Sequence, residues 1–230
     1  MAEISSRCSP IFLHNTMKNL ESKMGAKHRE ALEKTPFSIY KEIPSLPMSL
    51  SRLPAIIRRF RERNISFAFA RGVEVPFTPS EFSIVLGLPT KGQPVDVNLK
   101  MKSRTMERLF SGKLQNLNRK NIVNKLDELA NKDSAKDIDD FCRLYMLLVF
   151  NCFLFPTSNY WTPGFLLPYL DDLSNVGEFA WGIAAYSFLV QEMRKCVGAG
   201  GNRKKYLDGC TVGLMVSEFD LNDYITYICI

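Results

Sequence analysis

The fold is decided by residues 65–95, ISFAFARGVEVPFTPSEFSIVLGLPTKGQPV. In the first half of this stretch, apolar residues alternate with small or polar ones on both sides of Gly72, with Phe67 and Phe69 before it. A period of two around a glycine is typical of two half-buried antiparallel strands joined by a turn. Pro76 has no N–H to donate, so we expect the second strand to lie at a sheet edge or to end there. The first half therefore predicts a β-hairpin.

The second half of the stretch carries the start and stop signals of a short helix. Thr78 fits the N-cap, Pro79 the first helical position and Glu81 the partner in a capping box. Gly87 is placed to end the helix in a left-handed conformation. Pro89, with the glycine and the proline that follow it, forces an extended loop.

Helical periodicity dominates the remainder of the chain. Trp181 and Gly182 lie inside one expected helix, where the indole should pack in the core and the glycine should let another helix approach closely. The fold class that follows is mainly α: a single multi-helix domain with one small β-hairpin near its N-terminal third. Outside the stretch above, the expected helices span residues 15–34, 49–63, 103–110, 119–130, 134–155, 162–169, 175–196 and 204–216.

Composition divides the chain into a polar N-terminal part and a helical body. Residues 1–45 are polar and end in spaced prolines, which predicts an N-terminal arm and linker. Residues 46–216 carry the helical pattern and form the expected domain. The chain has 230 residues, of which 46% are hydrophobic and 23% charged, so it can bury the core of a globular protein.

We expect neither membrane spans nor disulfides. The longest apolar run, residues 144–155, stops at Pro156 and falls well short of the about 20 residues that cross a bilayer. Residues 1–20 lack the continuous apolar core of a signal peptide. Cys142, Cys152 and Cys210 lie inside apolar helical patterns, which predicts reduced, buried thiols.

The sequence offers no set of side chains with the spacing of a catalytic or metal site. Its two histidines, His14 and His28, both lie in the polar N-terminal part, and no cysteine has the context of a nucleophile. There is no C-x-x-C pair, and the glycine-rich residues 198–205 have neither the Walker spacing nor a preceding strand. We therefore expect no catalytic, metal-binding or cofactor-binding residue, no small-molecule substrate, and a protein that is not an enzyme.

Basic residues carry the one positive hint of a partner. The formal net charge of +6 favours acidic partners, of which nucleic acid is the first to consider. Basic side chains that share a face would contact phosphates, whereas the alternative is a set of solvated helix faces, partly paired with Glu62 or Glu107. The candidates for nucleic-acid contact are Arg58, Arg59, Arg61, Arg63, Arg71, Lys100, Lys102, Arg104, Arg203, Lys204 and Lys205.

Two blocks of the sequence resemble the plant mobile domain family, which is often labelled aminotransferase-like and includes the maintenance-of-meristems proteins. The resemblance covers roughly residues 46–215. The first block matches at Phe67, Phe69, Gly72, Glu74, Thr78, Glu81, Leu86, Gly87, Leu88, Pro89, Gly92, Pro94 and Val95. The second matches at Arg143, the apolar run 144–155, Tyr169, Leu170, Leu173, residues 179–182, Ala184, Leu189, Gly209 and Cys210.

The resemblance implies a helical domain that transposable elements have spread through plant genomes. Its domesticated members act in the nucleus, in meristem maintenance, genome stability and transposon silencing, which implies a nuclear location and a protein partner. Nucleic acid is a second partner class, and no membrane is implied. Residues 217–230 depart from the family pattern, so we expect a divergent or truncated C-terminal tail.

Two alternatives stay open at this point. The chain could be an enzyme or accessory factor of a plant transposable element, as the aminotransferase-like label and the family's neighbouring SUMO-protease-like domains suggest. Pyridoxal phosphate chemistry needs a Schiff-base lysine beside a phosphate cup, and no lysine here has that context. The chain could also be a truncated fragment without a function of its own.

Overall fold

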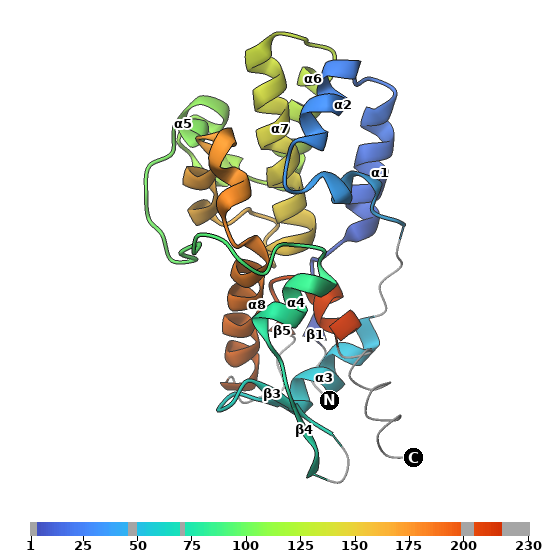
Figure 1. Ribbon diagram of the computed structural model, residues 1–230, viewed down its shortest axis with the longest axis vertical. Helices are drawn as coiled ribbons and strands as arrows, with labels where there is room; N and C mark the ends of the chain where they lie inside the picture. The colour runs from blue at the N-terminus through green and yellow to red at the C-terminus, as the bar shows by residue number, and fades with distance from the viewer. Residues whose placement is uncertain (1–3, 46–49, 70–71, 199–204, 218–230) are drawn as a thin grey trace.

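Helix α7 (Ala135–Val149) forms the centre of the molecule and continues into a π-helical turn, η5 (Phe150–Leu154). The computed structural model describes residues 4–45, 50–69, 72–198 and 205–217 (Figure 1). Every residue from 144 to 155 is buried, so the long apolar run of the sequence is the core. Ser134 begins the helix as predicted, since its hydroxyl accepts the Asp137 N–H at 3.2 Å. The mainly helical class is confirmed.

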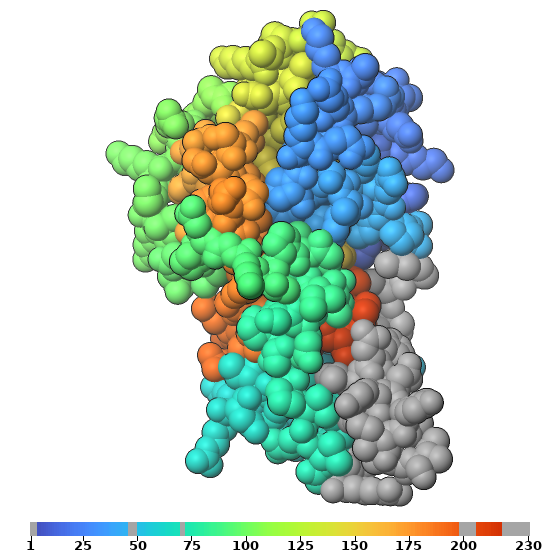
Figure 2. All heavy atoms as spheres, in the orientation of Figure 1, coloured from blue at the N-terminus to red at the C-terminus, as the bar shows by residue number. Residues whose placement is uncertain are grey.

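The N-terminal segment packs on this central helix. Helices α1 (Pro10–Glu21) and α2 (Ala26–Glu33) lie with α6 (Arg119–Leu129) against α7 and η5, and Figure 2 shows the blue N-terminal atoms on the yellow ones. Leu13, Met17, Leu20 and Leu32 are buried there, because they line one face of each helix at spacings of three and four. Residues 10–33 are therefore not a solvated arm; a domain boundary at residue 45 stays a prediction.

The predicted hairpin is present as strands β3 (Ser66–Ala68) and β4 (Glu74–Pro76), which pair antiparallel with Phe67 opposite Val75. Gly72 turns the chain with φ +75°, and Pro76 lies on an edge strand, both as expected. A third strand, β2 (Phe60–Arg61), pairs with the other side of β3. The predicted helix 49–63 is therefore wrong in its last turn: α3 (Leu53–Arg59), which follows η2 (Leu50–Arg52), ends where Phe60 turns extended and packs on Phe67.

Helix α4 (Pro79–Val85) has the predicted ends. The Thr78 hydroxyl accepts the Glu81 N–H at 3.3 Å and donates to the Glu81 carboxylate at 2.6 Å. Gly87 has φ +66°, and the Leu88 N–H then reaches back to the Ser83 carbonyl at 2.9 Å, which is the hydrogen bond of a Schellman cap. The loop at Pro89 follows directly.

Helix α8 (Trp181–Gly198) crosses α4 at close range. A β-carbon on Gly182 would lie 2.6 Å from the Ser83 Cβ, so only glycine allows this approach. Trp181 is fully buried, and its indole N–H donates to the Val176 carbonyl at 2.8 Å, as the core interpretation predicts. The helix begins at Trp181 and not at residue 175, because η7 (Leu173–Glu178) precedes it as a separate 3₁₀ segment.

Short elements complete the fold. Helix α5 (Arg104–Phe110) and the 3₁₀ segments η1 (Ser38–Glu42), η4 (Leu114–Asn116) and η6 (Gly164–Leu170) cover the core. Strands β1 (Ile4–Ser5) and β5 (Lys205–Tyr206) pair in parallel, and residues 211–217 are helical. The predicted tail lies outside the described residues from 218 onward. No described helix has both the length and the hydropathy that crossing a bilayer demands.

Candidate interaction surfaces

The first basic cluster lies on α3 and β2. Arg58, Arg61 and Arg63 are exposed, whereas the Arg59 guanidinium lies 5.3 Å from the centre of the Phe69 ring. Arg61 donates to the Arg58 carbonyl at 3.0 Å. Arg59 and Arg61 therefore make contacts within α3, β2 and the hairpin, so part of this cluster stabilises the fold. Of the remaining candidates, Arg71, Arg203 and Lys204 lie outside the described residues, and Lys205 belongs to β5.

The second basic cluster lies elsewhere on the molecule. Lys100, Lys102 and Arg104 are exposed on the segment that leads into α5, which Figure 1 draws in the upper part of the view, while α3 and the hairpin lie in the lower part. The structure does not bring the two clusters together. Nucleic-acid contact by these residues stays a prediction.

Residues 96–103, which we call the strap, are fixed at both ends. At the first end, the Asp96 N–H donates to the Tyr169 hydroxyl at 2.9 Å. At the second end, the Asp171 carboxylate accepts the Ser103 hydroxyl at 2.8 Å, and it also accepts the N–H groups of residues 104 and 105 at 2.9 and 2.8 Å. Figure 1 shows the strap as the green trace that reaches α5.

Asp171 holds this second end as an ionised group. Burial alone raises the pKa of Asp171, but the hydrogen bonds from Thr105, Ser103 and Arg104 outweigh burial and lower the pKa below its ordinary value. A carboxylate at the first turn of α5 is also favoured by the helix dipole. The sequence carries no local signal for this role of Asp171, because its partner Arg104 lies 67 residues earlier in the chain.

A groove of about 980 Å³ runs between the strap, α5 and η6. Two of its apolar side chains are unusually open, since Met101 is 64% and Leu114 57% exposed. Lys100, Lys102 and Glu107 supply its charges. Its deeper apolar wall includes Val97, Leu99, Met106, Phe165 and Leu167. An apolar groove with a basic edge is suited to binding.

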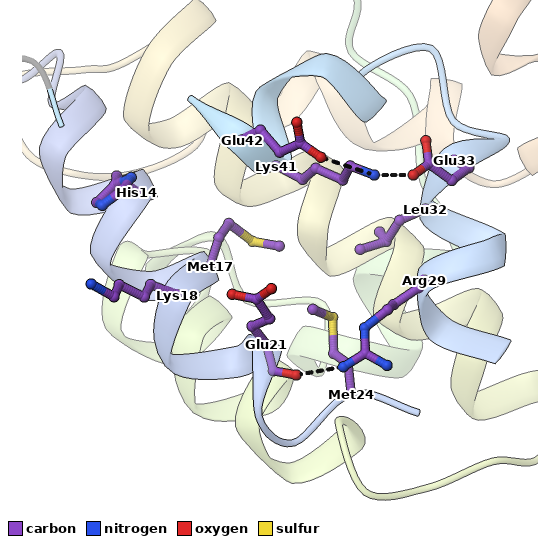
Figure 3. Close-up of a pocket in the computed structure, with 10 residues that line it drawn as sticks. All are labelled: His14, Met17, Lys18, Glu21, Met24, Arg29, Leu32, Glu33, Lys41 and Glu42. Atoms are coloured by element: carbon purple, nitrogen blue, oxygen red, sulfur yellow. Dashed lines mark hydrogen bonds and ion pairs between the residues drawn. The ribbon is translucent and has the colours of Figure 1, made fainter. Parts of the chain in front are cut away.

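A smaller hollow of about 460 Å³ lies between α1, α2 and η1, as Figure 3 shows. Lys41 forms ion pairs with Glu33 and Glu42, and the Arg29 guanidinium donates to the backbone carbonyl of Glu21 at 2.8 Å. These contacts tie η1 to α2 and α2 to α1. We interpret the hollow as a structural junction.

The two histidines are used in packing. The His14 Nδ1 lies 2.9 Å from the Ile43 carbonyl, and the His28 Nε2 lies 3.2 Å from the Leu129 carbonyl. Because a carbonyl only accepts, these nitrogens carry the hydrogen. Burial raises the pKa of Cys142 and Cys152 to about 12, which disfavours the thiolate. In the described part of the chain, no three His, Cys, Asp or Glu side chains are grouped to hold a metal ion.

The predicted burial of the thiols is confirmed for the described residues. Cys142, Cys152 and Cys210 are buried and form no disulfide. The same is true of Cys8 and Cys196.

Sequence reasoning missed a stack of arginines and aromatic rings. The Arg7 guanidinium lies 4.5 Å from the centre of the Tyr160 ring, and Arg119 lies 5.0 Å from the same ring. Arg119 also donates to the side chain and the carbonyl of Asn151, at 2.8 and 3.2 Å, where the central helix ends. The one sequence signal was Asn151 itself, a polar residue inside the apolar run, which needs buried partners.

Comparison with known proteins gives one family and three curated relatives. A family model described as a domain of unknown function (DUF8566) matches residues 6–215. The chain is 27% identical over 205 residues to Protein MAINTENANCE OF MERISTEMS of Arabidopsis thaliana, a match that covers 83% of the chain and 41% of that protein. It is 26% identical to Protein MAIN-LIKE 2 and 24% identical to Protein MAIN-LIKE 1 of the same plant, over 78% and 70% of the chain.

These matches extend over only part of each relative. The chain spans 41%, 28% and 34% of the lengths of these three proteins. No solved structure matches the chain.

Proposed function

Because the chain belongs to the DUF8566 family and is a homologue of plant mobile domain proteins of the MAINTENANCE OF MERISTEMS type, we propose that it is a non-catalytic module that binds a protein partner in the nucleus. Its cellular role would be the one the resemblance implies: meristem maintenance, genome stability or transposon silencing. In this proposal the helical core presents the surface that the partner binds.

One observation carries the proposal. The groove beside the strap leaves Met101 and Leu114 open to solvent at 64% and 57%. Burying an exposed apolar side chain of this size in an interface is worth about 1.5–3 kcal/mol. A preformed apolar groove on a soluble domain is a typical site for a partner.

The test is to isolate the tagged full chain from plant nuclei after nuclease treatment and to measure its size by gel filtration. We expect it to elute with a protein partner in fixed proportion. Nuclease treatment removes partners that are held only through nucleic acid. A chain that stays outside the nucleus, or that elutes alone as a monomer, would refute the proposal.

Nucleic-acid contact is the second candidate function. Arg63, Lys100 and Lys102 are exposed and form no ion pair with another described residue. In gel-shift assays over a salt series, affinity should fall linearly on logarithmic axes, and each lost phosphate contact should reduce the slope by about one. Arg61→Glu with Arg63→Glu tests the first cluster, and Lys100→Glu with Lys102→Glu tests the second. No binding even at low salt would remove this candidate.

A further inference from the structure

We infer that the groove beside the strap takes an extended peptide of the partner protein, in which apolar residues alternate with aspartate or glutamate. The inference rests on the proposed function and names the partner's binding segment. Backbone, apolar contacts and charge each point to this occupant.

The strap has peptide groups without partners. Between its anchored ends, the backbone N–H and carbonyl groups of Lys100, Met101 and Lys102 make no hydrogen bond with another described residue. An extended peptide laid beside them would satisfy its own backbone groups on this edge, as strand-adding ligands do elsewhere. Successive side chains of such a peptide point in opposite directions. One set would enter the groove, and the other would face the strap's side chains and solvent.

The apolar wall fits the first set of side chains. Met101 and Met106 are unbranched and adapt to the shape of what binds them, and Leu114 lines the same groove. Phe165, the one aromatic side chain among the described groove residues, is only 7% exposed. The groove therefore lacks the open rings on which the bases of a single-stranded nucleic acid would stack. This favours a peptide over an oligonucleotide.

The charges fit the second set. Lys100 and Lys102 form no ion pair with another described residue, so a carboxylate of the ligand would be their first. The one acid in the groove, Glu107, belongs to the first turn of α5, and its carboxylate lies against Gly112, where a β-carbon would approach it to 2.6 Å. Nearby Arg108 is bound to Asp140 and adds no free charge. The strap side of the groove is thus basic.

The groove is also fixed before it binds. The Tyr169 hydroxyl and the Asp171 carboxylate hold the strap at its two ends, both from the η6 region that forms the opposite wall. A ligand therefore does not have to order this segment, which removes one cost of association.

The probe is a fluorescein-labelled decapeptide of alternating leucine and aspartate, and its binding to the full chain is measured by fluorescence anisotropy. Met101→Glu should weaken binding by at least about tenfold, because it places a charge in the apolar contact. Lys100→Glu with Lys102→Glu should weaken it by about tenfold and reverse its salt dependence. Ile84→Glu is the matched control, since Ile84 is 67% exposed on α4, and it should leave affinity unchanged.

Three further ligands test the mode of binding. The same peptide N-methylated at alternate residues should lose binding, because one edge of its backbone can no longer donate. A leucine–lysine decapeptide should not bind. A ten-residue oligothymidylate that binds as tightly and displaces the peptide would show a nucleic-acid site and would overturn the inference. So would equal affinity of the wild-type chain and Met101→Glu, or no binding of the leucine–aspartate peptide at all.

Gel filtration of the chain from nuclei tests the proposed function separately from the peptide-binding assay. If Met101→Glu keeps its nuclear partner in gel filtration, the groove is not the docking site, although the module still binds a protein. If the wild-type chain has no partner there, the proposed function fails whatever the peptide does.

Discussion

Gly182→Ala should destabilise the fold by forcing α4 and α8 apart. The added methyl would lie 2.6 Å from the Ser83 Cβ and 3.0 Å from its Cα, so the backbone of α4 must move and not only a side chain. Overpacking of this kind costs about 1–3 kcal/mol. Alanine regains at most about 1 kcal/mol of helix propensity at this second position of α8. The net loss should be about 1–2 kcal/mol.

This loss is large enough to measure by urea unfolding followed by far-UV circular dichroism. For a chain of this size it corresponds to a fall in Tm of about 2–8 °C. The midpoint should move and the slope should not, because the native surface is preserved. Gly177→Ala is the matched control: a β-carbon there meets nothing within 4 Å, so stability should be unchanged or slightly higher.

A second substitution identifies the cause. Ser83→Gly removes the side chain that the new methyl strikes, so the double variant Gly182→Ala with Ser83→Gly should lose less stability than the two single losses added together. The Ser83 hydroxyl also donates to the Pro79 carbonyl at 2.7 Å. This hydrogen bond is lost both in Ser83→Gly and in the double variant, so it cancels in the comparison. If Gly182→Ala is as stable as the wild type, the close approach of α4 and α8 is wrong.

Three further changes test separate parts of the fold. Asp171→Ala removes three hydrogen bonds, one to Ser103 at the end of the strap and two to the first N–H groups of α5, and should cost about 2–3 kcal/mol and expose residues 96–103 to limited proteolysis; unchanged cleavage would contradict the anchoring. Burial first and Glu192 second raise the pKa of Asp208 from 3.8 to about 6, so the folded state holds this proton more tightly than the unfolded state. Stability should therefore fall by about 1 kcal/mol, allowing for solvent screening, as pH rises from 4 to 6. Asp208→Asn should remove that slope in urea unfolding. Arg119→Ala should cost about 2 kcal/mol, whereas Arg63→Ala, on the exposed end of the first cluster, should cost under about 0.5 kcal/mol; equal losses would show that the hydrogen bonds from Arg119 to Asn151 do not stabilise the fold.

The features that the sequence predicted correctly are those whose partners lie within a few residues. Gly72 and Gly87 take their positive φ values from the turn and the helix end around them. Thr78 and Glu81 meet across a single helical turn. Such signals depend on local backbone sterics and local hydrogen bonds, which do not require any contact with distant parts of the chain.

The features that were missed depend on tertiary partners that the pattern of the segment itself does not reveal. Phe60 leaves its helix because its backbone pairs with strand β3 and its ring packs on Phe67. The arginine-rich pattern around Phe60 indicates neither interaction. Residues 10–33 looked like a polar arm because each helix alone is only weakly amphipathic; their apolar stripes matter once α7 is beside them. Both basic clusters are positively charged, but the sequence alone does not show whether their residues lie on the same face of the folded protein.

The fold-deciding stretch also fixes the position of the groove. After α4 is held against α8, Gly92 passes the chain that enters α8 so closely that a β-carbon would lie 2.8 Å from the Ala180 nitrogen and the Glu178 carbonyl. Gln93 then pairs with this chain on both sides, through its N–H to Glu178 at 2.7 Å and its carbonyl to Ala180 at 2.9 Å. Only three residues later, Asp96 reaches Tyr169 and the strap begins. Each of these contacts restricts the conformation of the residues that follow it. The glycines and prolines that made the loop predictable therefore also place the basic edge of the groove opposite its apolar wall.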